Sequence, residues 1–225
     1  MKVETCGVPV RGEFINTDRD AARTALGVPK DALLLTVVGG SLGSVEVSEA
    51  VRECAPDLLT TFGHLEIHAQ MRGAGTGPEN NTKRSALGEG FCVDTAKRFK
   101  ITRFFDDMAQ QLAASDLVLA RAGAGICAEL LQTTVPSVLW PLANAADNHQ
   151  VRNAEWMHQM GVSVVFRLGG GSHGTHGLAG VLASSIRDVK SRERMRENAK
   201  SRTGGVHASA YIANILLDTA QAACV

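Results

Sequence analysis

Short apolar runs alternate with amphipathic stretches along most of the chain. The runs are rich in Val, Leu, Ile and Phe, which is typical of strands buried on both faces. The sequence predicts strands at 33–39, 64–69, 100–104, 116–120, 136–140 and 162–166. Helices are predicted between them, at 44–62, 107–114, 124–133 and 148–160. The alternation predicts an α/β fold with a Rossmann-like parallel sheet of about six strands and right-handed crossovers.

The two ends of the chain depart from this alternation. The end of the chain is predicted to form three consecutive helices, at 175–187, 189–201 and 205–222. Near the start, residues 6–14 are expected to be extended, and a short helix is expected to end at Gly27 and Pro29. We therefore expect residues 1–30 to be a linker-like segment that leads into a single domain at 31–225.

Composition and charge exclude several classes of protein. The chain has 225 residues, of which 44% are apolar, enough for a globular core. Its 23 Lys and Arg balance 23 Asp and Glu, whereas nucleic-acid-binding domains have a basic excess. No apolar run reaches the roughly 20 residues of a membrane span, and the first residues lack the apolar core of a signal peptide. The five cysteines are scattered, so we expect reduced thiols in the cytoplasm rather than disulfides or zinc.

The segment after the first predicted strand is a candidate ligand site, because open parallel sheets bind ligands beyond the carboxyl ends of their strands. The sequence there is "GGSLGS" at 39–44, followed by a long helix. Glycines such as Gly40 let the backbone approach a ligand, and the helix start presents free N–H groups to an anion. The turn has neither the G-x-G-x-x-G spacing nor the Lys of a P-loop. On its own it fits either a phosphate cradle or a tight turn.

The segment after the fourth predicted strand begins in a similar way and adds a carboxylate. The sequence "RAGAGICAE" at 121–129 opens a helix with small residues, a second possible place for an anion. Glu129 lies about one turn into that helix. A phosphate would repel a carboxylate, so we interpret Glu129 as a group that holds hydroxyls, as the acidic residue of dinucleotide folds holds a ribose. The alternative is a favourable charge near a helix N-terminus.

The third predicted strand is followed by aromatic residues that are suited to cover a flat base. Phe104 is expected to belong to the core, which leaves Phe105 nearer the edge. Asp106 or Asp107 is expected to cap the following helix.

The fifth predicted strand is followed by a cluster of amide and imidazole groups. Asp147 or Asn148 is expected to cap a helix whose first turn contains His149 and Gln150. Such donors and acceptors suit a polyhydroxylated ligand, although an ordinary capped surface helix explains each residue alone. The sequence shows no metal-ligand spacing and no convincing general base, so we predict no metal site and no cofactor and leave the catalytic base unassigned.

Taken in order, these segments resemble the C-terminal half of the MurG family. The resemblance covers nearly the whole chain and rests on "GVPVR", "VVGGSLGS", "FFDDMAQQLAASDLVLARAGAGICAELL" and "PSVLWPLANAADNHQVRNAEWM". Members of this family are cytoplasmic peptidoglycan N-acetylglucosaminyltransferases of the GT-B fold. They move GlcNAc from UDP-GlcNAc to lipid-linked muramoyl-pentapeptide, which converts lipid I to lipid II. The resemblance implies that this chain is the UDP-GlcNAc-binding half of such an inverting transferase.

The resemblance also implies which residues bind the phosphates of the donor. Arg11 would lie by the diphosphate. The glycine turn, with Gly40 and Ser41, would contact the donor near its phosphates. The second helix start would offer backbone N–H groups to the diphosphate, those of Ala124, Gly125 and Ile126.

The base and the sugars of the donor would be bound by other residues. The backbone at Phe105 would recognise uracil, and Glu129 would hold the ribose hydroxyls, in agreement with its interpretation above. His149 and Gln150 would bind hydroxyls of the GlcNAc.

Compared with the family, the chain is expected to lack the N-terminal Rossmann domain, which in the family binds the lipid acceptor and the membrane and is expected to hold the catalytic base. Val8 replaces the family's asparagine before "PVR", and 72–90 is an atypical, loop-like insertion. Transfer needs both substrates held in line across the interdomain cleft. The resemblance therefore implies that the isolated chain binds donor without turnover, and that a partner chain or missing domain binds the acceptor and mediates any contact with the inner face of the membrane.

Two other functions remain open from the sequence. One is a UDP-sugar-binding module without catalysis. The other is a related transferase or 2-epimerase that uses another UDP-sugar, although no acid/base set supports an epimerase.

Overall fold

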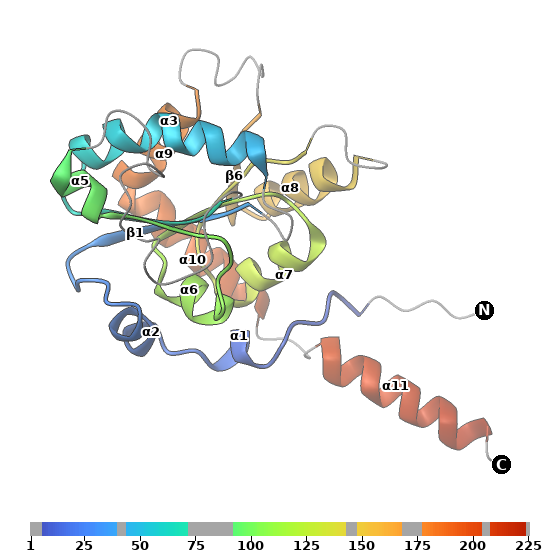
Figure 1. Ribbon diagram of the computed structural model, residues 1–225. Coiled ribbons are helices and arrows are strands. Elements are labelled where there is room, and N and C mark those ends of the chain that lie inside the picture. The colour runs from blue at the N-terminus through green and yellow to red at the C-terminus, as the bar shows by residue number, and fades with distance from the viewer. Residues whose placement is uncertain are drawn as a thin grey trace.

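The computed structural model of the protein describes residues 6–39, 44–71, 92–142, 148–167, 177–203 and 208–223. Their six strands form one parallel sheet in the order β3-β2-β1-β4-β5-β6 (Figure 1). The strands are β1 (Leu33–Val38), β2 (Leu65–Gln70), β3 (Phe99–Thr102), β4 (Leu117–Ala120), β5 (Ser137–Leu139) and β6 (Ser163–Val165). The predicted six-stranded parallel sheet of a Rossmann-like α/β fold is confirmed.

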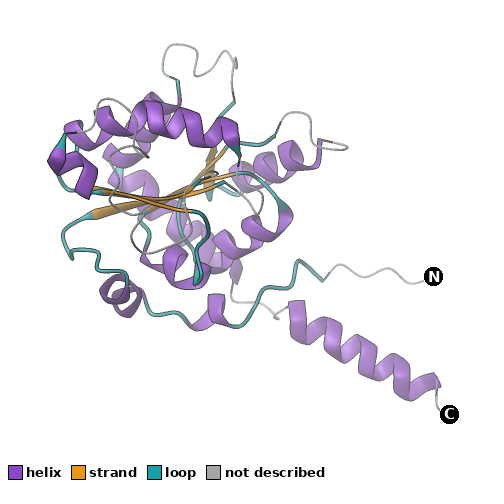
Figure 2. Cartoon of the chain, in the orientation of Figure 1, coloured by secondary structure: helices purple, strands orange, loops and turns teal. Residues whose placement is uncertain are grey.

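Helices cover both faces of the sheet, which lies between them as the middle layer (Figure 2). One face packs against α3 (Val45–Thr61), α5 (Val93–Lys97) and α9 (Leu178–Arg187). The other packs against α6 (Met108–Ala114), α7 (Ala124–Gln132), α8 (His149–Gln159) and α10 (Val189–Thr203). All of these except α5 were predicted from the sequence, within about three residues at each end.

Strand β1 shows how the sequence builds both layers. All six of its residues are buried. Leu35 and Val37 pack into the core beneath α3, whereas Leu34 and Val38 pack into cores on the opposite face. Successive side chains of a strand point to opposite faces, so a central strand must be apolar on both. This requirement is the reason that continuous apolar runs predicted the strands.

The segment before the sheet contains one helix that was predicted and one that was not. The described residues from 6 to 11 contain neither helix nor strand, and α1 (Glu13–Asn16) follows them. Phe14 is only 2% exposed and packs with residues of α6 and α7. The prediction that the extended segment reaches Phe14 is therefore wrong, because the chain turns there to bury the ring. Helix α2 (Arg19–Ala25) was predicted, and it ends before Gly27, whose φ is +63°.

Hydrogen bonds from two arginines to one carboxylate hold α2 against the sheet. Asp116, which directly precedes β4, accepts hydrogen bonds from Arg19 at 2.6 Å and from Arg23 at 3.1 Å. The same carboxylate accepts the Leu34 backbone N–H at 2.9 Å. These hydrogen bonds to Asp116 join the N-terminal segment to the amino ends of β1 and β4.

The three consecutive helices predicted at the end of the chain are confirmed as α9, α10 and α11 (Ala208–Ala223). Helix α11 projects away from the other layers, on the side of the molecule where the described N-terminal segment before α1 runs (Figure 1). The predicted insertion at 72–90 lies outside the described residues. No helix in the described part of the chain is long and apolar enough to cross a lipid bilayer.

Candidate functional site

The two glycine-containing segments predicted to bind an anion begin side by side at the carboxyl edge of the sheet. Strands β1 and β4 are neighbours, with Val38 opposite Ala120, so the segments that follow them start together. The strand order reverses between these two strands, which is where open α/β sheets bind their ligands. The Ser44 N–H, at the beginning of α3, donates to the carbonyl of Gly39, the residue that follows β1, at 3.0 Å. Gly40 and Ser41, the predicted donor contacts in this turn, lie outside the described residues.

Helix α7 begins at Ala124 with the free N–H groups that the sequence predicted. Gly123 is its N-cap residue and has no side chain to satisfy them. The first intrahelical bond of α7 is donated by Cys127 to Gly123, at 3.1 Å, so the N–H groups before it have no helical partner. Ala124 and Gly125 are exposed, and a side chain built on Gly125 would meet nothing within 4 Å. The start of α7 is therefore open to an anion.

Glu129 and Arg11, predicted to bind ribose and diphosphate, are brought together by α1. Glu129 is half-buried on α7, and this burial raises the pKa of its carboxyl, while the nearby charge of Arg11 lowers it and that of Glu13 raises it. Arg11 forms an ion pair with Glu13 at 3.0 Å, and its guanidinium lies over the ring of Phe14 at 5.2 Å. The buried Phe14 thus anchors the exposed Arg11 close to α7.

The burial of the two phenylalanines in the loop after β3 is the reverse of the prediction. Phe104 was expected in the core but is 57% exposed, whereas Phe105 is half-buried and packs against the core. The Thr102 hydroxyl donates to the Phe104 carbonyl at 2.8 Å, which closes a turn at the end of the strand and breaks its alternation. Asp107 caps α6 by accepting the Gln110 N–H at 2.9 Å, as one of the two predicted aspartates. The backbone at Phe105 therefore lies in the loop that ends β3, at the carboxyl edge.

A cavity of about 330 Å³ adjoins this loop. Besides Phe104 and Phe105, it is lined by His68 and Lys100 of the sheet and by Gln111 of α6. The sequence did not predict it, because strand alternation shows which residues share a face but not where a helix fails to cover them.

His149 and Gln150 are placed at the start of α8, as predicted, but the expected side-chain cap is not seen. Asn148 is the N-cap residue, yet its backbone is left-handed, with φ +53°, and its side chain makes no capping bond. A capping side chain needs an extended backbone to reach the helix N–H groups. The other predicted cap, Asp147, lies outside the described residues. The Gln150 side-chain carbonyl instead accepts the Leu142 N–H at 3.0 Å, which ties α8 to the segment after β5.

Arg121 is a residue at this edge to which the sequence assigned no role. It directly follows β4 and is 9% exposed. Its guanidinium donates to the Ser44 hydroxyl at 2.8 Å and to the Trp140 carbonyl at 3.2 Å, and it pairs with Glu46 at 2.5 Å. It also lies over the indole of Trp140, at 5.0 Å from the ring centre. The signal that could have identified it is a cation placed directly after an apolar strand and before a helix start of small residues.

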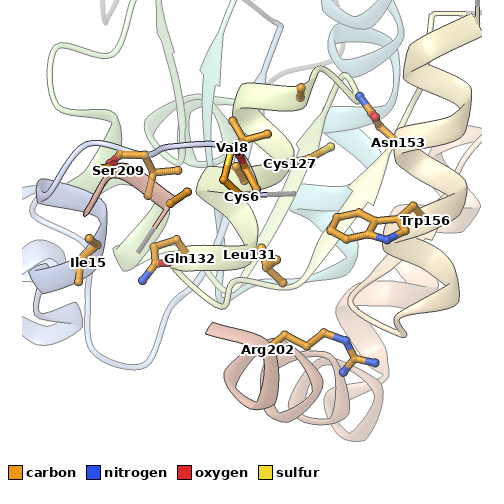
Figure 3. Close-up of a pocket in the computed structure, with 15 residues that line it drawn as sticks. Cys6, Val8, Ile15, Cys127, Leu131, Gln132, Asn153, Trp156, Arg202 and Ser209 are labelled. Carbon is orange, nitrogen blue, oxygen red and sulfur yellow. Dashed lines mark hydrogen bonds between the residues drawn. The ribbon is translucent and has the colours of Figure 1, made fainter. Parts of the chain in front are cut away.

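A second cavity, of about 290 Å³, lies along the outer side of α7 (Figure 3). It is bounded by the N-terminal segment, α7, α8, the end of α10 and the start of α11, and residues such as Val8, Leu131 and Trp156 line it. The Ser209 hydroxyl donates to the Val10 carbonyl at 3.4 Å, which joins two of these walls. Among the described residues with a predicted role, only Ala124 lines this cavity. The part of the chain that the structure describes contains no group of three or more His, Cys, Asp or Glu suited to hold a metal ion.

Comparison with known proteins places this arrangement among glycosyltransferases. Residues 34–209 match the model of the glycosyltransferase family 28 C-terminal domain. Two relatives carry the name UDP-N-acetylglucosamine–N-acetylmuramyl-(pentapeptide) pyrophosphoryl-undecaprenol N-acetylglucosamine transferase. The relative from Salinibacter ruber is 33% identical over 87% of this chain and 49% of its own length. The relative from Chromobacterium violaceum is 34% identical over 91% of this chain and 54% of its own length.

Solved structures show the same fold. The crystal structure of Acinetobacter baumannii MurG superposes with a TM-score of 0.61 at 23% identity, and covers 92% of this chain and 55% of that one. WaaG, a glycosyltransferase of lipopolysaccharide biosynthesis, gives 0.59 at 18% identity, over 85% of this chain and 48% of that one. The chain spans about half the length of the relatives that it matches.

Proposed function

Because the chain belongs to the glycosyltransferase family 28 C-terminal domain family, we propose that it is the donor-binding half of an enzyme that transfers GlcNAc from UDP-GlcNAc. The observation that supports this most strongly is the arrangement at the strand-order reversal. The open start of α7 lies there, with Glu129 one turn further along the helix and Arg11 near Glu129. These groups match the diphosphate and ribose of a nucleotide sugar.

The diphosphate is proposed to bind to the starts of two helices. A helix N-terminus stabilises negative charge through its free N–H groups and its dipole. At α7 these N–H groups belong to Ala124, Gly125 and Ile126, and Arg11 adds a positive charge nearby. The turn containing Gly40 and Ser41 is proposed to contact the donor near its phosphates.

The uridine and the sugar are proposed to bind on either side of the diphosphate. The backbone at Phe105 recognises uracil, and the Glu129 carboxylate accepts hydrogen bonds from the ribose hydroxyls. His149 and Gln150 bind the hydroxyls of GlcNAc. The Gln150 carbonyl is already engaged by Leu142, so its amide group is the end of this side chain that is left to donate to the sugar.

The acceptor is proposed to be the lipid-linked muramoyl-pentapeptide named in the relatives, bound by a domain or partner chain outside this sequence. The catalytic base is proposed to lie in that acceptor-binding half as well. We therefore propose that the chain alone binds donor without transferring the sugar, that it works in the cytoplasm, and that contact with the membrane is made through the acceptor-binding half.

Calorimetric titration of the chain with UDP-GlcNAc, UDP-glucose, UDP and ADP tests the proposed function. We expect saturable binding of UDP and UDP-GlcNAc, weaker binding of UDP-glucose and none of ADP. Replacing Glu129 by Ala should weaken UDP-GlcNAc binding at least tenfold, the scale of losing a hydrogen-bonded charged group.

The matched control is Glu155→Gln, which removes a surface ion pair with Arg167 and should leave binding unchanged. Equal affinity for ADP and UDP, or no binding of any uridine nucleotide, would contradict the proposal.

A further inference from the structure

Arg121 is a buried cation at the strand-order reversal, and it touches three elements that meet there. It follows β4, reaches Ser44 and Glu46 at the beginning of α3, and contacts Trp140 directly after β5. Its side chain is about nine-tenths buried. A buried guanidinium needs hydrogen-bond acceptors, and here three of them fix the relative positions of the three elements.

The contact with Ser44 controls where the glycine turn ends and α3 begins. Ser44 is the N-cap residue of α3, and its hydroxyl accepts the Val47 N–H at 3.3 Å as well as the bond from Arg121. The backbone N–H of the same residue donates to the Gly39 carbonyl, directly after β1. Arg121 therefore fixes the residue that links the end of β1 to the first turn of α3.

Trp140 restricts the orientation of the Arg121 guanidinium. Its carbonyl accepts one N–H of Arg121, and its indole lies against the cation at 5.0 Å. Cation–π stacking favours this arrangement and restricts the orientation in which the remaining N–H groups can point toward Ser44. Lysine has a single rotatable ammonium and cannot reproduce such a planar fork.

We infer that Arg121 is a positioning residue for the diphosphate of the donor, an inference that rests on the proposed function. It acts through Ser44, by holding the start of α3 beside the start of α7 so that free N–H groups of both helices face the same anion. Its hydrogen bonds to Ser44, Glu46 and Trp140 engage the guanidinium within the protein, so its effect on the donor is indirect.

The inference predicts a loss that depends on the phosphates of the ligand. In Arg121→Lys, the affinity for UDP should fall about tenfold, while the affinity for uridine, which lacks phosphates, should change less than about twofold. Ser44→Ala removes the hydroxyl that links Arg121 to α3 and should give the same pattern, with a smaller loss for UDP. Both affinities are measured by ligand-observed NMR titration of the full chain, together with its melting temperature.

Arg98→Lys is the matched control. Arg98 is a largely buried arginine that donates to three backbone carbonyls, those of Leu59, Phe62 and Leu65, but it directly precedes β3 at the amino edge of the sheet. Its replacement should lower the melting temperature and leave the ratio of UDP to uridine affinity unchanged. This control separates a general loss of stability from a loss of affinity that is specific to the phosphates of the ligand.

Every outcome of these titrations either supports or overturns the inference. A selective loss of UDP binding in Arg121→Lys and Ser44→Ala, absent in Arg98→Lys, supports it. Equal losses for UDP and uridine, or no loss for either, overturn it while leaving the proposed function intact. If Arg121→Lys does not fold, the result for Ser44→Ala decides. If the unchanged chain binds no UDP, the proposed function fails and the inference fails with it.

Discussion

Glu129 is subject to two opposing physical effects. Half-burial on α7 raises the pKa of its carboxyl, because water no longer solvates the charge fully. Arg11 opposes this shift, whereas the charge of Glu13 adds to it. A carboxylate that is to accept hydrogen bonds from a ribose must be ionised. The net raised pKa means that the ionised carboxylate lowers the stability of the fold, and shifts of this kind are common at functional sites such as the one proposed.

Replacing Glu129 by Gln should make the protein more stable at neutral pH. Because the folded-state pKa is raised above the usual value of 4.5, the protonated carboxyl is favoured in the fold, and its contribution is lost as the pH rises through the folded pKa. Glutamine is neutral throughout, so Glu129→Gln should melt about 1–2 °C above the unchanged chain at pH 7, with the difference vanishing near about pH 4. Thermal unfolding followed by circular dichroism at pH 4, 5.5 and 7 measures this. A variant that melts lower at pH 7 would show that the ionised carboxylate stabilises the fold.

Single residues differ in how far the sequence could predict them. Glu129 was correctly predicted to lie beyond the first turn of a helix, because its place depends only on the local pattern. Arg121 was missed because its partners Ser44 and Trp140 are distant in sequence, and only the sheet order brings them together. Phe104 was wrongly expected in the core because the turn closed by Thr102 cannot be seen in an apolar run.

At the scale of elements, the strands could be predicted because they are buried on both faces. Two helices could not be predicted because they are too short. Central strands such as β1 are apolar on both faces, a pattern that turns do not share. Helices α1 and α5 have four and five residues, too few for a 3.6-residue period to appear. Tertiary packing stabilises both instead: Phe14 of α1 is buried, and Ala96 of α5 packs against the core.

The start of α7 can be tested by adding one methyl group. A side chain at Gly125 meets nothing within 4 Å, and alanine is favoured over glycine in a helix by roughly 0.5–1 kcal/mol. Gly125→Ala should therefore raise the melting temperature by about 1–3 °C. It should also weaken UDP-GlcNAc binding at least fivefold, because the methyl group obstructs the close approach of the diphosphate to the backbone.

The control for this variant is Gly63→Ala, which also has free space around the added methyl group but precedes β2, at the amino edge. It should leave donor affinity unchanged. An undiminished affinity in Gly125→Ala, measured by the same calorimetry, would show that the diphosphate does not bind at α7.

At the scale of the whole molecule, most of the described residues that are proposed to bind the donor follow the carboxyl ends of β3, β4 and β5, and Arg11 joins them from the N-terminal segment. The relatives are about twice as long as this chain, and the resemblance assigns acceptor binding to their other half. The N-terminal segment and the start of α11 meet at Ser209 and Val10, so both ends of the domain emerge near the outer cavity beside α7. The fold followed from local sequence patterns, whereas this meeting of distant segments could not be predicted from them.

The central claim, that the donor binds at the strand-order reversal, is tested most directly by amide hydrogen exchange with and without UDP-GlcNAc. We predict that the donor slows exchange at the starts of α3 and α7 and in the loop after β3, within residues 44–48, 121–129 and 104–107. Slowed exchange confined instead to the outer cavity of Figure 3, in residues 6–10, 153–156 and 208–209, would contradict the claim and move the ligand to the other side of α7.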